Sequence, residues 1–193
     1  IDVADIRYMQ GLKDYIKIYD DVLAHRICKQ IVESADESKF TKSTVRQDEN
    51  STANSGGVIK EDRNCYNKWL DKQFENDVFN SVGKILNLYQ NDIGTFADGA
   101  EGKDTGYDHL LYKGSEKGKY TTHVDYFSQA PRLLSISILL NDNFDGGNFC
   151  FFDEYVIEKK VGSAIAFPSN FMFPHAVLPV SNGDRHSVIT WIR

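Results

Sequence analysis

The chain has 193 residues, a formal net charge of −6 and 41% hydrophobic residues. This length and composition predict one globular domain with a sizeable core and exclude a disordered chain. The acidic balance disfavours nucleic acid as a partner, because proteins that bind its backbone normally present a basic face. No run of about 18 apolar residues is present, so no membrane span is expected. The three cysteines show no CxxC spacing, which favours a reducing, cytoplasmic compartment over a disulfide framework.

The first secondary structure expected in the chain is a strand over residues 15–19, followed by a helix. Asp20 or Asp21 would cap this helix, because short acidic side chains satisfy free backbone N–H groups at helix starts. The apolar residues that follow have helical spacing and lie on one face: Leu23, Ile27 and Ile31.

Two polar segments flank a second apolar region in the N-terminal half. Residues 65–89 carry apolar side chains at helical spacing and predict one buried amphipathic helix, or two. The polar stretches 41–57 and 91–106 are rich in Ser, Asn, Thr and Gly and predict mobile loops. Such loops are candidates for a lid that a substrate would order.

From residue 107 the pattern changes to short strands separated by turn residues. The expected strands are 107–112, 120–125, 133–140, 148–152, 156–160, 164–167, 176–180 and 187–192. Short strands after helices predict a mainly β fold with flanking helices (α+β), namely a double-stranded β-helix, or jelly-roll barrel. Residues 1–193 would form a single domain, with 1–106 as the helical support region and 107–193 as the barrel core.

A His-x-Asp pair lies on one of the expected strands. His123 and Asp125 would point to the same side, because side chains two residues apart share a face of a strand, while Val124 would pack behind them. A third ligand from a distant strand would complete the two-histidine, one-carboxylate set that holds iron(II) and leaves coordination positions open. The alternative interpretation of the pair alone is a surface strand with a polar face.

His175 is the candidate for the third ligand, and Arg185 follows it ten residues later. Arg185 would supply a planar cation that grips a carboxylate with two hydrogen bonds. Taken alone, His175 could be a hydrogen-bonded core residue and Arg185 a solvated turn residue. The metal-site interpretation therefore depends on the order and spacing of all four residues.

Most of the chain resembles the iron(II)- and 2-oxoglutarate-dependent dioxygenases, and within them the prolyl 4-hydroxylase catalytic domain. The segment 112–127 resembles the family's Tyr…Gly…Tyr-x-x-His-x-Asp-Tyr-Phe segment. Residues 132–147 resemble its arginine-led strand and Gly-Gly turn, and 161–191 resemble its closing strands.

The resemblance implies an enzyme that hydroxylates a C–H bond while 2-oxoglutarate is decarboxylated to succinate. Its cofactors would be Fe(II), held by His123, Asp125 and His175, with 2-oxoglutarate and O2 as cosubstrates and ascorbate as a possible reductant. Arg185 would bind the distal carboxylate of 2-oxoglutarate, and Tyr112 would form a hydrogen bond with 2-oxoglutarate. The family often has a tyrosine where this chain has Leu139, so Ser135 or Ser137 would compensate, or Arg185 would act alone.

The resemblance also implies a peptide or protein substrate with a prolyl residue, contacted by Tyr120, Arg132 and Trp191. One alternative keeps the chemistry but acts on a nucleic-acid base, a free amino acid or another small molecule. A further alternative is a non-catalytic barrel that serves as a binding module. The sequence leaves the oligomeric state open.

Overall fold

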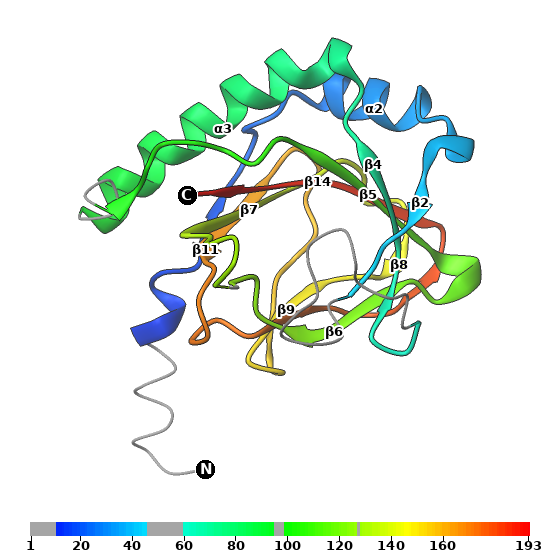
Figure 1. Cartoon of the computed structure of the whole chain (residues 1–193). Helices are drawn as coiled ribbons and strands as arrows, with labels where there is room; N and C mark the ends of the chain where they lie inside the picture. The colour runs from blue at the N-terminus through cyan, green and yellow to red at the C-terminus, as the bar shows by residue number, and fades with distance from the viewer. Residues whose placement is uncertain (1–10, 46–59, 95–98, 127) are drawn as a thin grey trace.

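The computed structural model describes residues 11–45, 60–94, 99–126 and 128–193. Two helices cover one side of a strand-rich body (Figure 1). They are α2 (His25–Glu33) and α3 (Lys72–Ile93), and single 3-10 turns lie at Glu37–Lys39 and Gly114–Glu116.

A seven-stranded antiparallel sheet forms the larger layer of the described residues, in the order β1-β11-β7-β14-β5-β4-β2. Its strands are β1 (Lys17–Tyr19), β2 (Thr41–Lys42), β4 (Tyr66–Trp69), β5 (Asp108–Lys113), β7 (Leu134–Leu139), β11 (Ala164–Pro168) and β14 (Asp184–Ile192).

A smaller antiparallel sheet of five strands among the described residues has the order β10-β9-β12-β6-β3. Its strands are β3 (Arg63–Asn64), β6 (Lys119–His123), β9 (Phe149–Phe151), β10 (Tyr155–Val156) and β12 (His175–Val177). A separate pair joins β8 (Asp145–Gly146) to β13 (Val180–Asn182).

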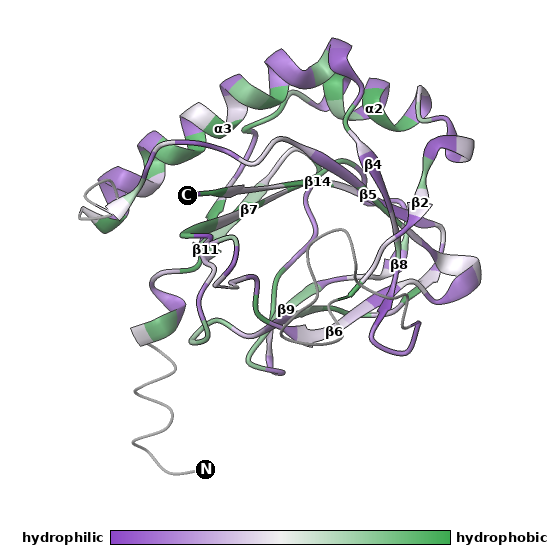
Figure 2. Cartoon of the chain, viewed as in Figure 1, coloured by the Kyte–Doolittle hydropathy of each residue, from purple (hydrophilic) through white to green (hydrophobic). Residues whose placement is uncertain are grey.

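The helices pack on the outer face of the larger sheet. Hydrophobic and hydrophilic residues alternate along α3 (Figure 2), and its buried positions recur at helical spacing. They join one face of the central strands in a single core cluster, which includes Val78, Val82, Ile85, Ile136, Ile138 and Val188. Burial of these side chains at about 25 cal/mol per Å² of apolar area is what holds the helices in place.

The inner face of the larger sheet lines the barrel interior, and strand alternation decides which residues reach it. On β14, Val188 and Ile192 join the helix-side core, whereas Arg185, Ser187 and Trp191 line an interior cavity. A second core cluster inside the barrel unites the two sheets, with Leu110 and Ile189 from the larger and Phe149, Phe151 and Val177 from the smaller.

The predicted double-stranded β-helix with flanking helices is confirmed, but several local expectations are wrong. The segment 66–69, expected to be helical, is strand β4, because it pairs in register with β5. Neither Asp20 nor Asp21 caps the first helix: the N-cap of α2 is Ala24, without a side-chain hydrogen bond. Residue 106 is also no boundary between helical support and barrel, since β1, β2 and β4 belong to the larger sheet.

The expected lid segments coincide only in part with described residues. Residues 46–59 and 95–98 lie outside them, so the lid stays a prediction. The described parts include β2 at the start of the first segment and the last turn of α3 at the start of the second. No helix in the described part of the chain is long and apolar enough to cross a membrane. Cys28, Cys65 and Cys150 are buried and free.

Candidate metal centre

Pairing of two strands in the smaller sheet brings the two predicted histidine ligands together. His123 is the last residue of β6 and His175 the first of β12, and the two residues face each other in the strand register. Asp125 lies two residues beyond the end of β6, in a bend. Strand alternation is therefore not what places its carboxylate, and Val124, expected to pack behind the pair, is 38% exposed.

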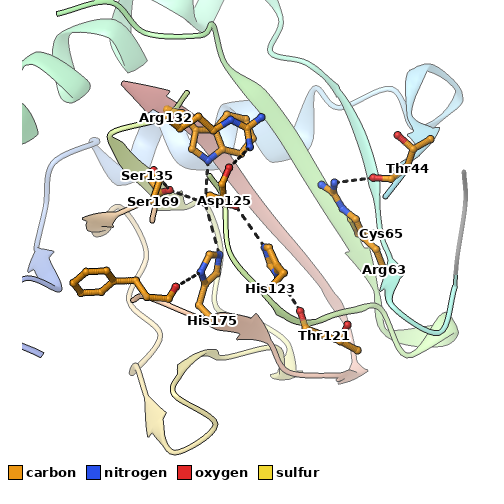
Figure 3. A network of polar contacts seen from close by, with 12 residues as sticks. Thr44, Arg63, Cys65, Thr121, His123, Asp125, Arg132, Ser135, Ser169 and His175 are labelled. Atoms are coloured by element: carbon orange, nitrogen blue, oxygen red, sulfur yellow. Dashed lines mark hydrogen bonds and ion pairs between the residues drawn. The ribbon is translucent and has the colours of Figure 1, made fainter. Parts of the chain in front are cut away.

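The three side chains form one compact, largely buried cluster (Figure 3). One ligand atom from each of His123, Asp125 and His175 lies within 4.8 Å of the other two. His123 Nε2 is 3.5 Å from Asp125 Oδ1, and His175 Nε2 is 3.7 Å from Asp125 Oδ2. His175 is 2% exposed and Asp125 6% exposed, so water has little access to these two ligands.

Backbone carbonyls orient both imidazole rings. His123 Nδ1 lies 2.8 Å from the carbonyl oxygen of Thr121, and His175 Nδ1 lies 3.1 Å from that of Phe173. A carbonyl only accepts, so each Nδ1 carries the proton and each Nε2 presents its lone pair to the cluster. Such contacts set the tautomer of metal-binding histidines.

Two donors hold one oxygen of the Asp125 carboxylate. The Ser135 hydroxyl donates to Oδ2 at 2.6 Å, and Trp191 Nε1 donates to the same atom at 2.9 Å. Ser135 also contacts the Ser169 hydroxyl at 2.8 Å. Oδ1 takes part in neither hydrogen bond, so it is the oxygen available to a metal ion.

The protonation states of the cluster suit a divalent cation. Burial alone would raise the pKa of Asp125, but His175, His123 and the Ser135 hydroxyl outweigh it and hold that pKa well below its usual range. Burial lowers the pKa of His175 to about 4. At neutral pH the cluster therefore offers a carboxylate and a neutral imidazole, which are the forms that bind metals.

Arg185 lies in the same cavity, whose volume is about 620 Å³. Its side chain is 3% exposed, and Nη1 donates to the Ser187 hydroxyl at 2.8 Å. Its buried Nε has no hydrogen-bond partner among the described residues. Burial lowers the pKa of this guanidinium relative to its usual value, and an anionic ligand beside it would oppose that effect. A carboxylate would supply the missing acceptor and balance the charge.

The structure places Tyr112 next to Arg185. The two residues face each other across β5 and β14, and the Arg185 guanidinium carbon lies 5.1 Å from the Tyr112 ring centroid. Leu139, where the family often has a tyrosine, lines a small cavity that Arg185 and Ser137 also line. Ser135 points instead to Asp125, so Ser137 and Ser187 are the hydroxyls beside Arg185.

The three residues expected to contact substrate all line the cavity, and each of them also contacts a residue of the metal cluster. Tyr120 stacks on His123 with 3.5 Å between ring centroids. The guanidinium carbon of Arg132 lies 3.5 Å from the centroid of the Trp191 ring, and its Nη1 donates to the backbone oxygen of Asp125 at 3.1 Å.

Ser187 and Arg63 were not predicted as site residues, and Ser135 contacts Asp125 where a contact with the cosubstrate was expected. Ser135 binds the Asp125 carboxylate and Ser187 binds Arg185. Arg63, from the N-terminal half, lines the same cavity. For the two serines, the available signal was a serine at alternate positions of a buried strand, because a hydroxyl there must form a hydrogen bond inside the barrel.

The described residues fit an iron(II) ion with 2-oxoglutarate. Two oriented imidazoles and one carboxylate oxygen match the facial donor set of non-haem iron(II). The unpartnered Nε of Arg185, buried in the same cavity, fits the distal carboxylate of the cosubstrate.

Comparison with known proteins agrees with this geometry. Residues 109–193 match the sequence model of the 2OG-Fe(II) oxygenase superfamily. No curated protein sequence matches the chain at a significant level.

Among solved structures, a viral collagen prolyl hydroxylase from Paramecium bursaria Chlorella virus-1, in complex with 2OG, has a TM-score of 0.66 and 20% identity, covering 93% of this chain and 96% of that one. A Pseudomonas putida prolyl-4-hydroxylase has a TM-score of 0.62 and 21% identity, covering 93% and 92%. A prolyl hydroxylase from Trichoplax adhaerens, in complex with a hypoxia inducible factor oxygen degradation domain peptide fragment, has a TM-score of 0.67 and 14% identity, covering 100% and 93%. The family match over residues 109–193 contains every predicted iron ligand and Arg185, so this part of the chain resembles the 2OG-Fe(II) oxygenase superfamily, and the chain shares its fold with prolyl hydroxylases.

Proposed function

We propose that this protein is an Fe(II)- and 2-oxoglutarate-dependent dioxygenase that hydroxylates a prolyl residue in a peptide or protein. The observation that carries the proposal is the convergence of His123, Asp125 and His175 in the cavity that also contains Arg185. When bound, iron(II) and 2-oxoglutarate supply the oxidising chemistry, in which O2 and the cosubstrate yield succinate, carbon dioxide and a hydroxylated C–H position.

The residues of the chain bind, orient and shield these groups. The carbonyls of Thr121 and Phe173 keep the Nε2 atoms of both histidines unprotonated and aimed at the metal position. Arg185 would hold the distal carboxylate of 2-oxoglutarate at the inner end of the cavity, where an unpaired anion would cost several kcal/mol. Nη1 of that arginine donates to Ser187, and its buried Nε, without a partner among the described residues, is available to the ligand.

A peptide substrate is supported by the shape of the cavity and by the structural neighbours. The cavity reaches the surface, because Val124 and Tyr126 line it and are 38% and 45% exposed. Prolyl hydroxylases share the fold, and one of them was solved with a peptide fragment.

The proposal is tested first by turnover of 2-oxoglutarate to succinate with added iron(II) and ascorbate. The His123→Ala and Asp125→Ala variants should lose turnover, because each removes one of three ligands. His25→Ala is the matched control: His25 lies on α2 with its side chain 62% exposed, so this variant should retain turnover. Undiminished turnover in H123A or D125A would refute the ligand assignment.

The prolyl substrate is tested separately by mass spectrometry on proline-containing peptides incubated with the active enzyme. We expect the mass of one oxygen atom to be added at a proline. Turnover of 2-oxoglutarate without oxygen added to any such peptide would contradict the prolyl substrate and leave the dioxygenase assignment in place. Oxygen added instead to a nucleic-acid base or a free amino acid would identify the alternative substrate class.

A further inference from the structure

Arg63 is a cation at the active-site cavity that the proposed reaction does not use. It lies on β3, at the edge of the smaller sheet, and is partly buried. β3 pairs with β6, and Arg63 faces Tyr120 in the register. This pairing places a residue from the N-terminal half beside the metal centre (Figure 3).

Among the described residues, the side-chain contacts of Arg63 are with neutral groups. Its Nε donates to Cys65 Sγ at 3.2 Å and its Nη1 to the carbonyl oxygen of Thr44 at 3.2 Å. Its guanidinium carbon lies 4.6 Å from the centroid of the Tyr120 ring. These contacts orient the guanidinium, and none of them is an ion pair.

No carboxylate in the described part of the chain lies within 4.0 Å of Arg63. Three lysines on neighbouring strands differ from Arg63 in this respect, because each forms an ion pair. The distance from Nζ to a carboxylate oxygen is 3.1 Å for Lys42 on β2, 2.6 Å for Lys68 on β4 and 2.7 Å for Lys113 on β5. Asp108 lines the same cavity, where burial raises its pKa and the charge of Arg63 acts to lower that pKa, but the two do not form an ion pair within 4.0 Å; Asp108 accepts a hydrogen bond from Asn67 at 3.5 Å. A partly buried guanidinium that forms no ion pair favours the binding of an anionic ligand, because the ligand would supply the opposite charge.

Arg63, Tyr120 and His123 form a stack of side chains that leads from the cation to the metal centre. Its guanidinium lies over Tyr120, and Tyr120 stacks on the His123 ring with an interplanar angle of 18°. A carboxylate bound to Arg63 would therefore lie on the order of 10 Å from the metal ligands, about two or three residues along an extended peptide.

The mouth of the cavity is suited to a peptide. Trp69 lines it and is 67% exposed, yet its ring is held against Gly106. Gly106 has a φ of +83°, and a Cβ atom there would lie 2.8 Å from the Trp69 ring, so only glycine leaves room for the ring. A fixed, exposed aromatic face beside a cavity is a common feature of surfaces that bind extended peptides.

We propose that Arg63 forms a subsite for the carboxylate of a Glu or Asp side chain in the peptide substrate, two or three residues from the hydroxylated residue. This inference rests on the proposed function and specifies which peptides the enzyme prefers. Arg63 would then determine specificity without touching the reacting atoms.

The test uses the full chain and peptides in which one proline is flanked by Glu, Gln or Lys, moved over the three positions on each side. At one position, kcat/KM should be about tenfold higher for Glu than for Gln, and lower for Lys. Arg63→Gln should remove the Glu preference, Arg63→Lys should retain part of it, and Arg63→Glu should favour Lys. Arg26→Gln is the matched control, because Arg26 lies on α2 and its Nη1 donates a hydrogen bond to Gln30. The R26Q variant should keep the wild-type preference.

Binding of the same labelled peptides, followed by fluorescence anisotropy with Mn(II) and 2-oxoglutarate present, gives a readout that does not need hydroxylation. A Glu preference in binding that disappears in R63Q supports the subsite even if no peptide gains oxygen, which would contradict only the prolyl assignment. Equal kcat/KM and equal affinity for the Glu and Gln peptides at every position would overturn the inference. The same Glu preference in wild type and R63Q would overturn it too.

Discussion

Replacement of Trp191 by phenylalanine would test whether a neighbouring indole holds the metal-binding carboxylate. Trp191 Nε1 donates to Asp125 Oδ2 at 2.9 Å, and the Ser135 hydroxyl donates to the same oxygen at 2.6 Å. Phenylalanine keeps an aromatic ring for Arg132, whose guanidinium carbon lies 3.5 Å from the Trp191 ring, and removes only the N–H donor.

The size of the effect follows from what remains at Oδ2. A hydrogen bond to a charged acceptor contributes about 1.5–3 kcal/mol. Since Ser135 still donates to this oxygen, we expect a loss of metal-binding free energy at the low end of this range, about 1.5 kcal/mol. This corresponds to a dissociation constant for the metal that is roughly tenfold larger. This agrees with the 10–100-fold losses, roughly, that follow removal of groups behind metal ligands.

The assay is calorimetric titration of the apoprotein with Co(II), together with the visible absorption spectrum of the bound ion. Ser135→Ala in the W191F background should weaken binding further, because Oδ2 then loses both donors. Trp69→Phe makes the same chemical change at a residue 67% exposed at the cavity mouth, and its Co(II) affinity should equal that of wild type. Wild-type affinity and an unchanged spectrum in W191F would refute the idea that Trp191 orients Asp125.

Three further predictions concern the cosubstrate, the core and pH. Arg185→Lys should raise the KM for 2-oxoglutarate about tenfold and Arg185→Gln about a hundredfold or more, since lysine keeps the charge and glutamine does not; an unchanged KM in succinate-release assays would exclude Arg185 from the site. Ile136→Ala, at a position 0% exposed between α3 and the sheet, should cost about 2–5 kcal/mol in urea unfolding, whereas Ile18→Ala, 43% exposed, should cost under about 1 kcal/mol. Burial lowers the pKa of His109 to about 3 and that of His186 to about 4, so between pH 6.5 and pH 4 the unfolded chain binds protons that the folded chain does not. The free energy of unfolding should therefore fall as pH decreases below 6.5, by about 2 kcal/mol per histidine at pH 5; His109→Phe should reduce this slope, and a flat profile over that range would contradict the prediction.

Short elements show where prediction from the sequence reached its limit. Tyr66–Trp69 lies at the start of the segment predicted to be helical from its apolar spacing, and its pairing with β5 makes it a strand. The long helix was easier to predict, because its buried positions repeat over many turns, although it begins at Lys72 and not at residue 65. Local propensity is weak compared with tertiary pairing over four residues, and it becomes informative when summed over a helix of this length.

The same division applies to the candidate site. The donors could be identified from the residues alone, because few residue types bind iron(II) or a carboxylate. His123, Asp125, His175 and Arg185 were predicted from their type, order and spacing. The groups that surround these donors become known only from the folded chain. Ser135 and Trp191 reach Asp125 because β7 and β14 are neighbours, and Arg63 reaches the cavity because β3 pairs with β6. Contacts between residues so far apart along the chain depend on strand pairing, which no local pattern of residues encodes.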